Sequence, residues 1–179
     1  MDAKLIATWV GIATGMTAVV TFFMSINQRK KELRWKQAEL ARKLIDDLFA
    51  NDDAAQGFYM LDGVQYPYKD FFNQPIIVFP NDVIKAINNT FAGTGLNPKD
   101  ARIMFCVDTL LFFLNRIENS LKSKLIVFED IKTPCDYYVS IIATNRSLFI
   151  SYMHSIGYVE LLQFCERFPS WAIQNETTD

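Results

Sequence analysis

The stretch 97-NPKDARIMFCVDTLLFFLNRIENSLKSK-124 predicts a long helix at the centre of the folded domain. Asn97 can cap its first turn, Pro98 stands at the first helical position and Asp100 adds an acid near the helix N-terminus. The residues that follow at helical spacing are Ile103, Val107, Leu110, Leu111, Leu114, Ile117 and Leu121. The residues that widen this apolar face are Met104, Phe105, Phe112 and Phe113. We therefore expect other helices to pack around this one.

Similar signals recur on both sides of this helix. Thr133-Pro134-Cys135-Asp136 predicts the start of a second long helix, 134–156, which Gly157 would end. Shorter helices are predicted after Asn81 and from Tyr158 to about Phe168. Residues 54–80 contain several glycines and prolines, which indicate an irregular segment with one extended piece at 76–79. The predicted fold class is all-α, a small helical bundle.

An uncharged run, 5-LIATWVGIATGMTAVVTFFMSINQ-28, precedes the bundle and is followed at once by Arg29, Lys30 and Lys31. As a helix it would be about 36 Å long, enough to cross a hydrocarbon core of about 30 Å. It is longer than the apolar part of a signal peptide and has no small-residue cleavage site at its end. The sequence thus predicts an N-terminal transmembrane helix, 1–28, that continues into a basic juxtamembrane helix, 29–50, before a helical cytoplasmic domain, 51–179.

The basic residues after this run predict its orientation. Residues 29–43 contain seven basic and two acidic side chains, and positive charge is retained on the cytoplasmic side of a membrane. We expect a single-pass protein of the inner (cytoplasmic) membrane with its N-terminus outside. The basic residues expected to contact the lipid surface are Arg29, Lys30, Lys31, Arg34 and Lys36.

Small residues recur along one side of the run, at Ala7, Gly11, Gly15 and Ala18. Such spacing lets two membrane helices approach closely. Glycine and alanine are also common in spans that make no such contact, so the pattern leaves helix–helix contact open.

The charge of the body favours some partners over others. Residues 44–179 contain 17 acidic and 10 basic residues, whereas a nucleic-acid-binding domain usually presents a basic face. We expect the partners to be the lipid bilayer and a protein, which is either another chain or a second copy, and no nucleic acid.

Motifs that carry chemistry are absent from the sequence. It has no phosphate loop, zinc-protease, nucleophile-elbow or kinase signature. Asp108, Asn115 and Asn119 share one side of the central helix, which could be a polar site, but a water-facing stripe explains them better. His154, the only histidine, has no identifiable partner, and the spacing of the three cysteines matches no standard metal site. We predict no catalytic residue, no cofactor and no metal.

The order of these features resembles a family. Leu110 to Glu118, followed by Lys124-Leu125-Ile126 and a tyrosine-rich helix, is similar to a broad group of uncharacterised bacterial single-pass membrane proteins with a helical cytoplasmic domain of unknown function. The resemblance implies a bacterial or phage origin and an all-helical domain. It assigns no catalytic residue.

Two classes of function fit these expectations. The first is a non-catalytic, membrane-anchored interaction module or subunit of a membrane complex, in which the anchor raises the effective concentration of the domain. The alternative is a membrane effector or regulator, for example in antiphage defence, whose anchor responds when a ligand or partner binds the domain.

Overall fold

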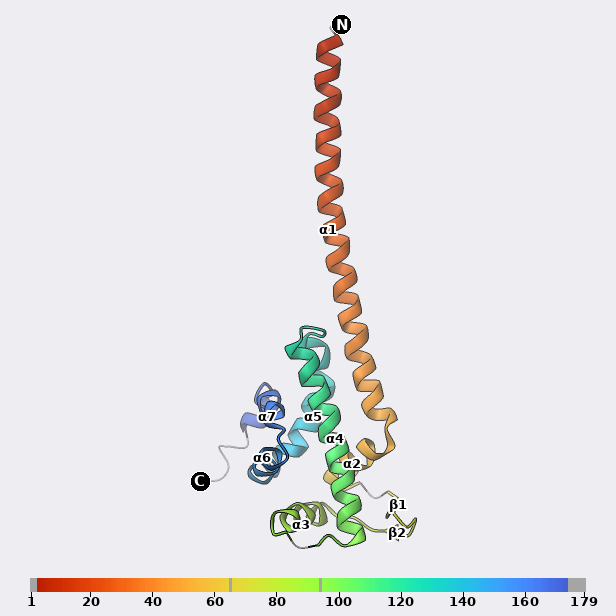
Figure 1. Cartoon of the computed structure of the whole chain (residues 1–179), viewed down its shortest axis with the longest axis vertical. Helices are drawn as coiled ribbons and strands as arrows, with labels where there is room; N and C mark the ends of the chain where they lie inside the picture. The colour runs from red at the N-terminus through yellow and green to blue at the C-terminus, as the bar shows by residue number, and fades with distance from the viewer. Residues whose placement is uncertain (1–2, 65, 94, 174–179) are drawn as a thin grey trace. The chain divides into compact units, whose positions relative to one another are not determined.

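The computed structural model describes residues 3–64, 66–93 and 95–173, with side chains described from Gly15 to Ala172 apart from the two gaps. Within these ranges all regular structure is helical except for one short hairpin (Figure 1). The chain divides into two compact units, Met1–Glu39 and Leu40–Asp179. The prediction of an all-helical chain is confirmed.

Helix α1 (Ala3–Ala50) supplies the described structure of the first unit and the opening turns of the second. In the first unit most of the described large apolar side chains of α1 are exposed; they include Met16, Val19, Val20, Phe22, Phe23, Met24, Leu33 and Trp35. In the second unit Leu44 and Leu48 of the same helix are buried in the hydrophobic core. The prediction that the uncharged run continues as a helix into the charged segment is confirmed.

The prediction of a transmembrane helix is wrong. Among the described residues, no helix is both long enough and apolar enough to cross a bilayer. The predicted single-pass topology and inner-membrane location depended on this span and are therefore not supported either. Residues 5–14 of the predicted span lie outside the described side chains.

Helix α4 (Pro98–Lys122) is the central helix of the second unit, as predicted. Its N-cap has the expected form, because the side-chain oxygen of Asn97 accepts a hydrogen bond from the Asp100 backbone N–H at 2.8 Å. Helices α2 (Asp52–Asp62), α3 (Pro80–Phe91) and α7 (Val159–Cys165) pack against it. Its apolar residues supply much of the core, including Ile103, Val107, Leu110, Leu111, Leu114 and Ile117.

The closest packing in this unit is between α2 and α4. A Cβ atom built on Gly57 would lie 2.4 Å from the Cys106 backbone oxygen, far inside van der Waals contact. Only a residue without a side chain lets the two backbones approach this closely. Gly57 therefore sets the separation of α2 and α4.

The segment predicted to be irregular, 54–80, contains more regular structure than expected. Asn51 ends α1, as predicted, but it also begins α2, because its side chain accepts a hydrogen bond from the Ala54 N–H at 2.9 Å. A two-stranded antiparallel hairpin follows, β1 (Tyr68–Lys69) and β2 (Pro75–Ile76), with Tyr68 opposite Ile76. Of the predicted extended piece at 76–79, Ile76 alone is paired in this hairpin.

The predicted helix 134–156 is wrong in its start and its continuity. Helix α5 (Phe128–Ala143) begins six residues earlier and contains Pro134 in its interior, and a break at Thr144-Asn145 separates it from α6 (Arg146–Ser155). Gly157 follows α6 with a φ of 81°, a left-handed conformation typical of a helix stop. Helix α7 falls within the predicted 158–168 region, and the short α8 (Pro169–Ile173) packs against α5.

Candidate functional site

The basic residues predicted to meet a lipid surface lie on α1 in the first unit. Arg29, Lys30, Lys31, Arg34 and Lys36 are all exposed. The structure therefore presents them to a partner or to solvent, without a bilayer span beside them among the described residues.

A shallow hollow of ≈ 520 Å³ lies beside these residues. It is lined by Lys30, Lys31, Arg34, Trp35 and Ala38. Trp35 is 65% exposed, so most of its ring is available for contact. Tryptophan and arginine are the residue types that most often dominate the binding energy of protein interfaces. Trp35 was not predicted as a site residue, although a tryptophan within a basic run is a signal that could have identified it.

The small residues predicted to contact another helix are only partly described. The side-chain surroundings of Ala7 and Gly11 lie outside the described residues. A Cβ atom built on Gly15 would meet no described atom within 4 Å, and Ala18 is exposed. Gly15 and Ala18, the two described members of this row of small residues, are therefore not packed against another described helix.

The predicted polar stripe on α4 is divided by the fold. Asp108 is half-buried and accepts a hydrogen bond from the Tyr152 hydroxyl of α6. Burial raises the pKa of the Asp108 carboxyl, and the hydrogen bond from Tyr152 partly opposes that rise. Asn115 is half-buried and Asn119 is exposed. Asp108 thus ties α6 to α4, a structural role that the sequence did not reveal.

A second carboxylate on α4, Glu118, was missed in the sequence. Its side chain is 0% exposed, and Oε1 accepts a hydrogen bond from Arg167 at 2.9 Å. Burial raises the pKa of Glu118, while the positive charge of Arg167 opposes the rise. Glu118 stands four residues after Leu114 and so shares its buried side, which is the signal that could have identified it. The pair fastens the C-terminal part of the unit to α4.

Among the described residues, the three thiols lie in the core and the single histidine lies at the surface. Cys106, Cys135 and Cys165 are buried free thiols, and burial raises the pKa of each to about 12. His154 is exposed on α6. Over the described residues, no group of three or more histidine, cysteine, aspartate or glutamate side chains could hold a metal ion.

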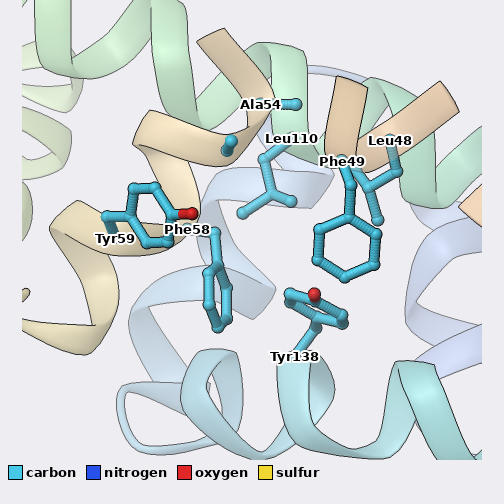
Figure 2. Close-up of a pocket in the computed structure, with 8 residues that line it drawn as sticks. Leu48, Phe49, Ala54, Phe58, Tyr59, Leu110 and Tyr138 are labelled. Atoms are coloured by element: carbon cyan, nitrogen blue, oxygen red, sulfur yellow. The ribbon is translucent and has the colours of Figure 1, made fainter. Parts of the chain in front are cut away.

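An apolar pocket lies between α1, α2, α4 and α5 in the second unit (Figure 2). The rings of Phe49, Phe58 and Tyr138 gather on one side of it, and Phe58 and Tyr138 meet edge to face with their centroids 4.3 Å apart. Its cavity volume is ≈ 10 Å³, about enough for one water molecule. This pocket is too small for any ligand larger than a water molecule, and we regard it as a packing gap in the core.

A larger open groove, ≈ 360 Å³, lies beside the hairpin. Its walls are the two extended segments 66–68 and 77–79, and Ile77 is 70% exposed. Nearby charges include both Lys69 and the Asp82–Lys99 ion pair, so their mixed sign does not select one class of partner.

No protein-family model, curated protein or solved structure matches this chain. The resemblance to uncharacterised bacterial proteins therefore stays a prediction. Function has to be argued from the geometry alone.

Proposed function

We propose that this chain is a non-catalytic, helical protein-interaction module whose contact surface is α1 between Gly15 and Ala38. The observation that carries the proposal is the exposed apolar surface of this part of α1. Met16, Phe22 and Phe23 are 60–67% exposed, and Leu33 is 60% exposed. A helix that is apolar on all sides is normally covered, and large exposed apolar patches mark interaction sites.

The occupant proposed for this surface is a helix of another protein. An extended, regular helix offers side chains in rows, and a second helix packs along such rows by fitting its own side chains between them. Arg34, which is the neighbour of Leu33 in sequence, adds a residue type that often anchors protein interfaces.

The second unit supports the non-catalytic part of the proposal. The three carboxylates on α4 are already used in contacts within the unit. Asp100 accepts hydrogen bonds from Asn89 and Asn97, Asp108 accepts one from Tyr152, and Glu118 accepts one from Arg167. A catalytic carboxylate must instead reach its substrate within hydrogen-bonding distance. The second unit is best explained as a stable body that carries the contact helix.

Site-specific photo-crosslinking in cells tests the proposal. A photoreactive amino acid replaces Leu33 in one variant and Gln28 in a control variant; both side chains are exposed on α1, but they lie about 140° apart around the helix. We expect a discrete protein adduct from position 33 and little from position 28. Absence of an adduct at 33, or equal adducts at both positions, would refute a specific contact surface on α1.

A further inference from the structure

One stripe of α1 has the alternating three- and four-residue spacing of a coiled-coil seam. Its members between Met16 and Gln37 are Met16, Val19, Phe23, Ile26, Lys30, Leu33 and Gln37. Five of these seven are apolar, and Met16, Phe23 and Leu33 are at least 60% exposed. Such a stripe packs against a matching stripe on a second helix.

The residues that border this seam differ in charge along the helix. Beside its N-terminal half the flanking positions hold Val20, Phe22 and Asn27, which are uncharged. Beside its C-terminal half they hold Arg29, Arg34 and Lys36, all basic and all exposed.

The acidic residues of this part of α1 stand elsewhere. Glu32 and Glu39 both fall at a heptad position that does not border the seam. The seam is therefore flanked by positive charge alone, and it also contains Lys30.

Pairing of two copies of this chain would give no charge complementarity beside the seam. In a parallel pair the residue equivalent to Arg29 faces the residue equivalent to Arg34 of the other helix, and such like-charge pairs destabilise helix pairing. In an antiparallel pair the basic half of each seam lies largely against the uncharged half of the other, so no acidic residue lies opposite the basic ones.

We infer that the partner helix has an apolar seam bordered by acidic residues. This inference rests on the proposed function, and it follows from charge complementarity, since aspartate or glutamate beside the partner's seam would face Arg29, Arg34 and Lys36. An acidic residue opposite Lys30 would fix the register, because a polar residue within a seam penalises misaligned pairing.

Peptide binding to the purified full-length chain tests the inference. Two labelled peptides about four heptads long have the same apolar seam, with glutamate beside it in one and lysine in the other. Fluorescence anisotropy should show that the glutamate peptide binds about tenfold more tightly or better, and that added salt weakens its binding. A composition-matched acidic peptide with a scrambled seam should not bind.

Two single substitutions place the contact on the helix. Lys36→Glu reverses a charge beside the seam, whereas Lys31→Glu makes the same change at an exposed position away from it. We expect Lys36→Glu to weaken binding of the glutamate peptide about threefold and Lys31→Glu to change it much less. Equal effects of the two variants would reduce the interaction to nonspecific attraction by net charge and overturn the inference.

Other occupants give different outcomes. If the full-length chain forms a dimer or larger assembly that dissociates in Leu33→Lys, the partner is a second copy of this chain. If the chain binds vesicles of anionic phospholipid and does not bind the glutamate peptide, the partner is a lipid surface. Either result overturns the inference. A position-specific adduct at residue 33 together with equal binding of both peptides would leave the proposed function standing and refute the acidic partner alone. Loss of that adduct refutes the proposed function itself.

Discussion

Gly57→Ala should loosen the contact between α2 and α4 and destabilise the second unit. The added Cβ would lie 2.4 Å from the Cys106 backbone oxygen and 2.7 Å from its carbonyl carbon, whereas ordinary contacts begin at 3.4 Å. The two backbones would have to separate by about 1 Å, and a gap of that size forfeits a quarter to a half of the attraction between facing atoms.

The net cost follows from two opposing effects. Overpacking of this kind costs up to about 3 kcal/mol. Alanine is favoured over glycine in a helix by about 1 kcal/mol, which offsets part of that cost. We expect the free energy of unfolding to fall by about 2 kcal/mol and the melting temperature by about 4–8 °C.

Urea unfolding followed by circular dichroism measures this effect. Gly15→Ala is the matched control, because an added Cβ there meets no described atom within 4 Å, and it should leave the unfolding midpoint of the second unit unchanged. A Gly57→Ala protein as stable as the original chain would show that α2 and α4 do not approach as closely as the structure has them.

Three further predictions concern the second unit. Leu114→Ala removes a fully buried side chain and should lower the free energy of unfolding by about 2–5 kcal/mol; a loss below about 1 kcal/mol in urea titrations would contradict its place in the core. Because burial raises the pKa of Asp108 above its ordinary 3.8, the folded state holds the proton more tightly and stability falls as the pH rises through and above that value. Asp108→Asn should flatten part of this fall above the ordinary pKa of 3.8, and an unchanged slope would argue against burial of the carboxylate. Since burial raises the pKa of the three thiols to about 12, an alkylating reagent should label them slowly in the native protein and rapidly in urea; fast native labelling of any of them would place that thiol at the surface.

Local capping signals were enough to predict the centre of the fold. Asn97, Pro98 and Asp100 gave the start of α4, because a cap is formed by neighbours in sequence and needs no tertiary contact. The buried side of α4 also followed from its apolar spacing. The same logic failed at Pro134, which usually marks a first turn but lies inside α5, where tertiary packing outweighs the lost backbone hydrogen bond.

Features that depend on contacts between distant segments were not predictable. The break at Thr144-Asn145 has no glycine or proline to mark it, and the link from Asp108 to Tyr152 joins residues 44 positions apart. Asp108→Ala would leave the buried hydroxyl of Tyr152 without this hydrogen bond, a cost that a water-facing stripe on α4 does not predict.

Part of the proposed contact surface was visible in the sequence, and part of it was not. The basic residues of 29–36 stood out because charge in a short segment is visible in sequence, and the structure confirms that they are exposed. The uncharged run before them was assigned to a bilayer, and its continuous apolarity concealed the seam that begins at Met16. Leu33, Arg34 and Lys36 reveal that seam, since apolar and charged positions alternate there at helical spacing.

Hydrogen exchange of the full-length chain, with and without the glutamate-bordered peptide, is the most direct test that α1 is the contact surface. Exposed helices exchange their backbone amides quickly unless a partner covers them. We predict that the peptide slows exchange of amides within residues 16–38, while those of α4 keep their rates. Unchanged exchange in α1, or protection confined to the hairpin and α3, would contradict the assignment of the contact surface to this helix.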